Sequence, residues 1–295
     1  MAGERLIGSL ILAGILAATP ALASPAFPKA VRAAPPQFDD KDTLADAVAG
    51  RARDPANVAR DRWRHPLESL TFWGLRPADM IIDIDPGGGY WTEILAPFAK
   101  ATGGRYIGAV ADLNDPKVSE GQRRGVARFE ARFADASTWG RVETVGFGPV
   151  SGPLAPDGSV DFILAGRNIH NFMWRNMVGK LMDASFAALK PDGVLAIEEH
   201  RADPRPMVAD ARDGYVSEAY VIAAAQKAGF VLDGRSEINA NPKDSKDYPF
   251  GVWTLPPTRQ SAPNGQPPDP DFDHTKYDAI GESDCMTLRF RKPRS

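Results

Sequence analysis

A run of three glycines follows a short apolar segment and could admit a ligand close to the backbone. The run is Gly87-Gly88-Gly89, and it stands after Asp83-Ile84-Asp85-Pro86. Glycine has no Cβ, so a ligand can approach the main chain, and a helix that begins beyond the turn offers unpaired N–H groups. The third glycine of a G-x-G-x-x-G fingerprint would fall at Thr92. The glycines that bind a pyrophosphate in dinucleotide-binding proteins are therefore incomplete. The turn therefore favours a nucleoside without phosphates, the alternative being a tight turn with no ligand.

An aspartate stands at the end of the next apolar segment. Asp112 follows residues 105–110. A carboxylate at the end of the second strand of a nucleotide-binding sheet can accept hydrogen bonds from both ribose hydroxyls. Alone, an aspartate in a loop is as well explained by solvation. Together with the glycine turn, Asp112 predicts a ribose site.

A dense polar cluster follows a third apolar segment. It reads Arg167-Asn168-Ile169-His170-Asn171. His170 could act as a general base near neutral pH, because the ordinary pKa of histidine lies close to it. Asn168 and Asn171 could orient a substrate or part of a cofactor by hydrogen bonds. The alternative is that the asparagines only cap the loop.

A second polar group, residues 198–201, closes the following apolar segment. It contains His200, one of four histidines in the chain. A metal site is one interpretation, because imidazole and carboxylate groups are common ligands. Its ligands would be His170, His200, Glu198 or Glu199, and His65. The spacing matches no recognised zinc motif, so no metal ligand is predicted, and pairing of His200 with a neighbouring carboxylate is expected instead.

These polar groups stand at the ends of segments that alternate between strand and helix patterns. Short apolar runs predict strands at residues 79–84, 105–110, 144–147, 159–165, 194–197, 230–232 and 286–291. Helical patterns cover residues 90–100, 118–133, 176–189 and 216–228. Such alternation predicts an α/β fold, a Rossmann-like, doubly wound, mostly parallel sheet of seven strands whose carboxyl ends share one edge. No helix pattern separates the final two strands, so the last strand is expected to be antiparallel.

The flanking segments complete the domain organisation. Residues 42–70 predict two helices broken at Pro55 and Pro66, which form an N-terminal helical extension. Residues 239–284 are rich in proline, aspartate and asparagine and predict a long polar insertion over the sheet edge. Residues 41–295 are therefore expected to form a single domain.

The first residues predict export. Arg5, an apolar run over residues 6–18 and Ala21-Leu22-Ala23 are typical of a signal peptide over residues 1–23, followed by a linker over residues 24–40. The expected location is periplasmic or secreted, with no stable membrane insertion after cleavage. A net charge of −3 gives no sign of a nucleic-acid partner. The single cysteine excludes an intramolecular disulfide, and no oligomeric state is predicted.

The chain resembles the class I S-adenosylmethionine-dependent methyltransferases. More narrowly, it resembles a group of exported bacterial proteins known as predicted methyltransferases, over roughly residues 40–294. The segments that carry the resemblance are Arg64-His65-Pro66, residues 81–84, residues 86–95, Phe147-Gly148-Pro149, residues 167–171, Lys190-Pro191-Asp192-Gly193, His200-Arg201-Ala202, residues 236–249 and Gly281-Glu282-Ser283-Asp284.

The resemblance implies S-adenosyl-L-methionine as cofactor and a small molecule as substrate. It places the methionine part of the cofactor on Asp83 and residues 87–89, and the ribose on Asp112. The reacting edge would lie at Asn168, His170 and Asn171. The predicted cofactor-binding residues are Asp83, Pro86, Gly87, Gly88, Gly89, Tyr90, Asp112 and Asn171, and the predicted catalytic residues are His170, Asn168 and His200.

One residue departs from the D-x-G-x-G-x-G pattern of such enzymes. Asp85 stands where the first glycine is expected. Its side chain narrows the approach to the turn and adds a negative charge, which a positively charged sulfonium could accommodate.

The sequence predicts a methyltransferase and leaves two other classes open. Because S-adenosylmethionine is made in the cytoplasm, an exported chain could be a binding protein on a methyltransferase scaffold. A metal-dependent hydrolase that uses the histidines is the other. Thr92 and the missing helix before the last strand disfavour a nicotinamide oxidoreductase.

Overall fold

The computed structural model describes Met1, residues 40–204 and residues 211–294. The chain divides into two units, Met1–Ala34 and Pro35–Ser295, and the second is the subject below. The predicted signal peptide and linker fall outside the described residues, except at Met1 and Asp40. Within the described part of the chain, no helix has the length and apolar character needed to cross a bilayer.

A single seven-stranded sheet organises the second unit. Its strands are β1 (Met80–Ile84), β2 (Arg105–Ala111), β3 (Val142–Phe147), β4 (Val160–Gly166), β5 (Leu189–His200), β6 (Val231–Ser236) and β7 (Cys285–Arg291). The order across the sheet is β3-β2-β1-β4-β5-β7-β6. The five strands β1 to β5 pair in parallel, whereas β7 pairs antiparallel with both β5 and β6. The predicted fold class, with its antiparallel last strand, is confirmed.

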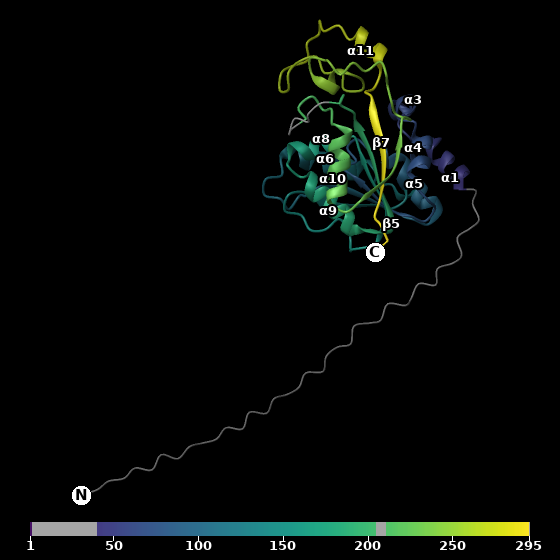
Figure 1. Cartoon of the computed structure of the whole chain (residues 1–295), viewed down its shortest axis with the longest axis vertical. Helices are drawn as coiled ribbons and strands as arrows, with labels where there is room; N and C mark the ends of the chain where they lie inside the picture. Colours follow the sequence, from purple (N-terminus) through teal and green to yellow (C-terminus); the bar gives the residue numbers. More distant parts are fainter. Residues whose placement is uncertain (2–39, 205–210, 295) are drawn as a thin grey trace. The chain divides into compact units, whose positions relative to one another are not determined.

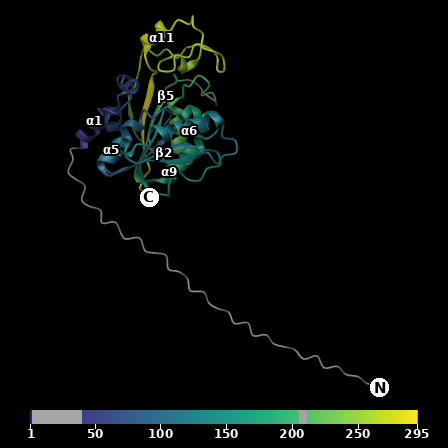
Figure 2. The same cartoon turned by 180° about the vertical axis from the view of Figure 1, so that it is seen from behind.

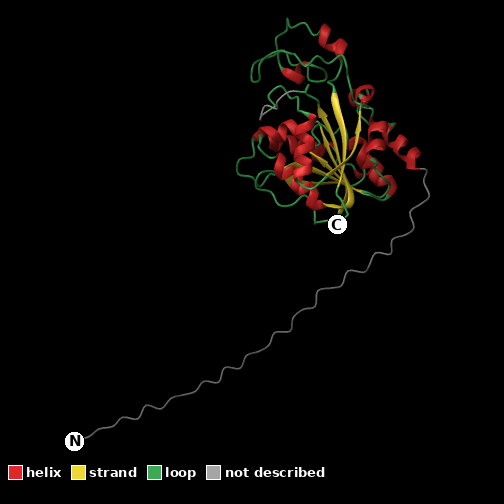
Figure 3. Ribbon diagram, in the orientation of Figure 1, coloured by secondary structure: helices red, strands yellow, loops and turns green. Residues whose placement is uncertain are grey.

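Helices cover both faces of the sheet (Figure 2 and Figure 3). They are α1 (Asp40–Val48), α2 (Pro55–Val58), α3 (Asp61–Arg64), α4 (Pro66–Trp73), α5 (Thr92–Thr102), α6 (Glu120–Arg132), α7 (Ala136–Trp139), α8 (Ile169–Trp174), α9 (Val178–Ala188), α10 (Glu218–Lys227) and α11 (Thr275–Ile280). One buried apolar cluster joins the sheet to α4, α5 and α6, through Leu70, Leu95 and Phe129. The other joins it to α8, α9 and α10, through Phe172, Leu181 and Val221.

The long polar insertion lies at the edge where the parallel strands end. His200, the last residue of β5, pairs with Cys285, the first residue of β7. The chain between β6 and β7 therefore leaves and re-enters the sheet at this edge, and Figure 1 shows it beyond the end of the sheet opposite the C-terminus. It contains a short 3₁₀ helix (Gly251–Thr254) and α11.

The N-terminal extension differs from the expected pair of helices. It forms four short ones, and the two prolines begin helices rather than only ending them. Pro55 opens α2 behind the Asp54 cap, and Pro66 opens α4. Proline suits the first turn, where its missing N–H would have no intrahelical partner. The extension thereby brings Arg60 and Arg64 of this region toward the sheet edge.

Candidate active site

In the glycine turn between β1 and α5, one glycine packs closely against a side chain and another faces open space. Gly89 has φ +86°, and a Cβ there would stand 2.4 Å from the Phe133 ring. Gly88, by contrast, has no other atom within 4 Å of such a Cβ. Arg132 fixes the turn by donating to the Gly88 carbonyl at 2.6 Å. The glycines thus seat the turn on α6 and leave its outer backbone accessible.

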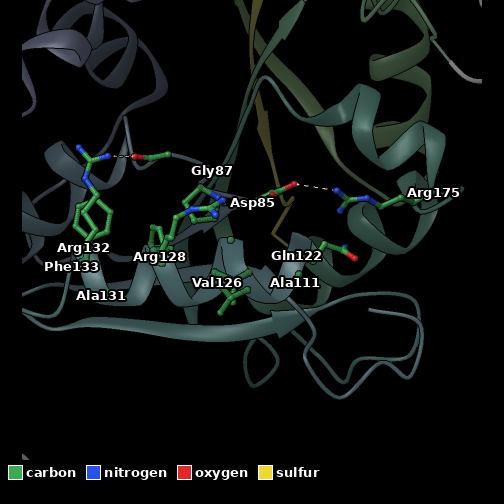
Figure 4. Close-up of a pocket in the computed structure, with 15 residues that line it drawn as sticks. Asp85, Gly87, Ala111, Gln122, Val126, Arg128, Ala131, Arg132, Phe133 and Arg175 are labelled. Atoms are coloured by element: carbon green, nitrogen blue, oxygen red, sulfur yellow. Dashed lines mark hydrogen bonds and ion pairs between the residues drawn. The ribbon is translucent and has the colours of Figure 1, made fainter. Parts of the chain in front are cut away.

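A cavity of about 750 Å³, here called the turn cavity, lies between this turn and α6. Its floor is apolar and includes Val110, Val126, Phe129 and Phe133. Figure 4 shows Arg132 and Arg175 reaching the turn from opposite ends of the cavity. Asp85 sits between them, 3.6 Å from the Arg175 guanidinium, with φ +47°. An apolar floor with a polar rim is suited to a flat heterocycle that carries polar substituents.

Two smaller cavities continue along the carboxyl edge of the sheet. The junction cavity, of about 250 Å³, shares Asp85 and residues 86–88 with the turn cavity. The histidine cavity, of about 280 Å³, shares Arg64, Arg167 and Asn171 with the junction cavity. The three cavities therefore adjoin in the order turn, junction, histidine, so that one ligand could extend from the glycine turn toward His170 and a second could meet it there.

A buried ionic network forms the wall behind the junction cavity. Arg64 contacts Glu198 at 2.9 Å, and Arg167 contacts Glu198 at 2.7 Å. Glu282 accepts from Arg60 at 2.5 Å and also from Arg167. Burial alone would raise the pKa of Glu198, but Arg167 and Arg64 lower it to about 2. Three guanidinium groups thus share two ionised carboxylates, which leaves an excess of one positive charge.

Several polar atoms of this wall have no hydrogen-bond partner among the described residues. They are Arg64 Nε, Arg167 Nη2 and Asn168 Oδ1, all buried. The amide of Asn168 donates from Nδ2 to the carbonyl of Ile84, which fixes the side chain at the end of β1. A buried donor or acceptor without a partner costs about 1–3 kcal/mol. These atoms would be satisfied by a ligand that brings a carboxylate to the guanidinium groups and an N–H donor to Asn168.

His170 is held by a buried carboxylate. Its Nδ1 lies 3.0 Å from Glu199 Oε1, and its backbone N–H donates to Oε2 at 3.2 Å. The His200 backbone N–H donates to Oε1 at 2.8 Å. Because the Glu199 carboxylate accepts a hydrogen bond from Nδ1–H, Nε2 of His170 is the nitrogen with a free lone pair. The geometry is that of a general base oriented by a third group.

His200 has a different environment. Its Nδ1 lies 2.5 Å from Ser283 Oγ and 3.7 Å from Cys285 Sγ. Burial lowers the pKa of His200 well below its usual range, and His170 and Arg167 lower it further. Burial also raises the pKa of the Cys285 thiol to about 12. His200 and Cys285 are therefore neutral at the inner end of the histidine cavity. The carboxylate partner expected for His200 belongs to His170 instead.

The metal interpretation can be compared with these contacts. Among the described residues, His170, Glu199 and His200 bring one ligand atom each to within 4.8 Å of one another. His65 lies apart, with Nδ1 3.2 Å from Asn239 Oδ1, and Glu198 belongs to the ionic network. The pairing of Glu199 with His170, and of His200 with Ser283, accounts for the same geometry without an ion.

The structure gathers most of the sequence-predicted site residues. Those that line the three cavities are Pro86, Gly87, Gly88, Tyr90, Asn168, His170, Asn171 and His200. Three others line none of these cavities. Gly89 packs on Phe133. Asp112 is buried and accepts from the Asn114 N–H at 3.0 Å, and Asp83 accepts from the Tyr106 hydroxyl at 2.9 Å inside the sheet.

The buried position of Asp83 predicts a pH-dependent stability. Burial raises the pKa of Asp83 to about 7, against about 3.9 for an unfolded aspartate. Between these values the folded state binds more protons, so the free energy of unfolding falls as the pH rises from about 4 to about 7. Asp83→Asn is expected to remove this part of the decline. Urea unfolding of both proteins at pH 5 and pH 8 measures how far the free energy of unfolding falls between the two pH values. An equal fall in the parent and in Asp83→Asn would contradict this prediction.

Several side chains of the site were not predicted from the sequence. They are Arg60, Arg64, Arg167, Trp253 and Glu282, and Glu199 was considered only as a possible metal ligand. Arg167 and Glu199 stand inside the two polar clusters that the sequence analysis identified, beside residues that it did select. Arg64 and Glu282 occur in segments that carried the family resemblance, which was the available signal for them.

Comparison with known proteins identifies the fold. No protein-family model and no curated protein matches the chain. Among solved structures, the cyclase SpnF has a TM-score of 0.51 and 16% identity, covering 86% of this chain and 93% of its own. A SAM-dependent methyltransferase from Aquifex aeolicus has a TM-score of 0.48 and 16% identity, covering 86% and 100%. A Burkholderia thailandensis 1,6-didemethyltoxoflavin-N1-methyltransferase, solved with 1,6-didemethyltoxoflavin and S-adenosylhomocysteine, has a TM-score of 0.41 and 14% identity, covering 86% and 80%.

At such identities the likeness concerns the fold. The strand order β3-β2-β1-β4-β5-β7-β6, with β7 antiparallel, agrees with it. The chain has the class I methyltransferase fold.

Proposed function

We propose that this protein is an S-adenosylmethionine-dependent methyltransferase that acts on a small-molecule acceptor. The observation that carries the proposal is the series of adjoining cavities along the carboxyl edge, from the open glycine turn to the His170–Glu199 pair. Ligands of open α/β sheets bind at this edge, where the strand order reverses between β1 and β4.

The unpartnered atoms of the site fit the cofactor. Its carboxylate would satisfy Arg64 Nε, and its ammonium group would donate to Asn168 Oδ1. The apolar floor of the turn cavity would cover the adenine. Asp85 lines both the turn and junction cavities and supplies a negative charge close to the positively charged cofactor. Asp112 is proposed as the ribose partner from its place after β2.

The residues of the chain would contribute positioning and proton transfer. The bound cofactor supplies an electrophilic methyl group. Asn171 lines both the junction and the histidine cavities and would orient the acceptor where the two meet. His170, oriented by Glu199, would take the proton of the acceptor. Holding donor and acceptor in line accounts for most of the acceleration expected in such a reaction.

Calorimetry with S-adenosylmethionine and S-adenosylhomocysteine tests the cofactor. Both are expected to bind with one molecule per chain. Asp112→Ala is expected to weaken binding about 10-fold, because hydrogen bonds from the ribose are lost. Asp157→Ala, in an exposed loop, is the matched control and is expected to bind normally.

The outcomes separate the remaining classes. If neither compound binds at millimolar concentration, the chain is better explained as a binding protein on this scaffold. If the purified protein contains a stoichiometric metal ion that His170→Ala removes, a metal-dependent hydrolase is favoured. If the cofactor binds normally to Asp112→Ala, the ribose assignment is wrong while the cofactor assignment stands.

A further inference from the structure

The ionisable side chains that line the histidine cavity are all basic. Three guanidinium groups, of Arg60, Arg64 and Arg167, and the imidazoles of His170 and His200 line it. No aspartate or glutamate is among the described residues that line it. The carboxylates of the ionic network lie on the buried side of the arginines, where Glu198 is 0% and Glu282 2% exposed. The surface offered to a ligand is therefore basic.

The charges of the network do not cancel. Three arginines contact two glutamates, and the buried Arg167 Nη2 has no partner within the part of the chain that the structure describes. Glu199, the third carboxylate nearby, is committed to His170 and to two backbone N–H groups. Because a buried excess charge is costly unless it is paired, an anionic ligand would stabilise this arrangement.

Aromatic and proline side chains form the outer part of the same cavity. Trp253 lies with its ring centroid 5.8 Å from that of His170 and 5.3 Å from that of Trp174. Pro256 and Pro257 line the cavity next to Trp253. Trp174 is 47% exposed, so an unusual amount of its apolar surface faces solvent at this end. Flat apolar walls of this kind accept a planar ring.

We propose that the acceptor is a small aromatic hydroxy acid, whose carboxylate contacts the arginines and whose ring lies against Trp253. This inference rests on the proposed function. The volume of about 280 Å³ is at the lower end for ligand pockets, which suits a single ring with its substituents. The Arg167 fork would receive the carboxylate through Nη2, the donor that lacks a protein partner.

The reaction at this acceptor balances with the groups present. The ring hydroxyl loses its proton to Nε2 of His170 and forms a bond from its oxygen to the methyl carbon. The bond from that carbon to sulfur breaks, and its electron pair stays on sulfur. An acceptor with a negative carboxylate also offsets the net positive charge that a bound sulfonium cofactor brings.

Three probes of equal shape and different charge test the proposal on the full chain. They are 4-hydroxybenzoate, 4-hydroxybenzyl alcohol and 4-hydroxybenzylamine, titrated by calorimetry with saturating S-adenosylhomocysteine. The anion is expected to bind at least about 10-fold more tightly than the neutral alcohol, which follows from a charge-assisted hydrogen bond, and the cation most weakly. Equal binding of anion and alcohol, or no binding of the anion, would overturn the proposal.

A pair of variants locates the anion. Arg60→Gln keeps a hydrogen-bonding side chain toward Glu282 and removes one charge that lines the histidine cavity. It is expected to lower the affinity for 4-hydroxybenzoate about 10-fold without changing that for the alcohol. Arg105→Gln, whose exposed guanidinium pairs with Glu143 and lines none of the three cavities, is the control and is expected to change neither. An equal loss in both variants would place the anion elsewhere.

The same titrations keep the two proposals separate. If S-adenosylhomocysteine binds but the anionic probe shows no advantage, the acceptor class is wrong and the methyltransferase proposal stands. If the anionic probe binds at the arginines but neither cofactor form does, the cavity is an anion site and the methyltransferase proposal fails.

Discussion

Replacing Arg167 by methionine is expected to lower the free energy of unfolding by about 3–5 kcal/mol, because Glu198 and Glu282 each lose one of their two arginine partners. A hydrogen bond to a charged group contributes about 1.5–3 kcal/mol. Arg167 is 8% exposed and contacts both Glu198 and Glu282, whose side chains are 0% and 2% exposed. Of the other two arginines, Arg60 contacts Glu282 and Arg64 contacts Glu198. Urea unfolding at pH 7 measures the loss.

A surface pair provides the matched control for this substitution. Arg105 contacts Glu143 at 3.0 Å, but its side chain is 56% exposed. Exposed ion pairs contribute about 0–1 kcal/mol, so Arg105→Met is expected to have a small effect. Similar losses in the two variants would show that the buried network contributes no more than a surface pair.

The pH dependence gives a second measurement on the same variant. Arg167 and Arg64 outweigh the effect of burial and hold the pKa of Glu198 at about 2, below the value of about 4.3 for an unfolded glutamate. This carboxylate therefore adds stability above about pH 4 that is lost as the pH falls toward 2. In Arg167→Met, the stability lost between about pH 4 and pH 2 is expected to be smaller than in the parent protein.

His170→Ala is expected to reduce the rate of methyl transfer by roughly 10²- to 10⁴-fold, which is the usual contribution of a general base. The affinity for S-adenosylhomocysteine is expected to stay unchanged, because His170 lines only the histidine cavity among the three. The rate is followed as S-adenosylhomocysteine formed with an acceptor that supports turnover.

Two further variants test whether the loss of rate in His170→Ala comes from proton transfer. His274→Ala, at the start of α11 and outside the three cavities, is the control for removing an imidazole. Glu199→Gln keeps the shape of the carboxylate but not its charge, and is expected to shift the pH profile of the rate together with a loss of rate. A His170→Ala rate within 10-fold of the parent would remove His170 from proton transfer.

The sheet could be predicted from the sequence because its strands are short apolar runs with clear ends. Ile81 and Ile82 in β1, and Ile163 and Leu164 in β4, are all buried, as parallel strands covered on both faces require. The antiparallel β7 followed from the missing helix before it. Helix α8 was missed, because asparagines and a histidine mask the spacing of Ile169, Phe172 and Met173, which are its buried face.

The site was predictable only in part, since its most important contacts join residues far apart in the chain. The clusters around His170 and His200 were found because they follow strands whose ends meet. The pairing of Arg64 with Glu198, or of Arg60 with Glu282, depends on how the N-terminal helices fold back over the sheet edge. No local pattern encodes it. Asp83 and Asp112 were selected by position; the Tyr106 hydroxyl holds Asp83 inside the sheet, and the Asn114 N–H takes up one oxygen of Asp112.

The insertion between β6 and β7 has an evolutionary consequence. It supplies Trp253, Pro257 and Thr258 to the histidine cavity, whereas the turn cavity is built from the sheet, the glycine turn and flanking helices. Its two ends are fixed on neighbouring strands, and the entropy cost of closing a loop grows only slowly, by about 0.6 kcal/mol for each doubling of length. Changes in this segment that leave Glu282 and its other buried anchors in place can therefore be accepted with little effect on the sheet. Selection can in this way change which acceptor fits while the nucleoside half of the site is inherited intact.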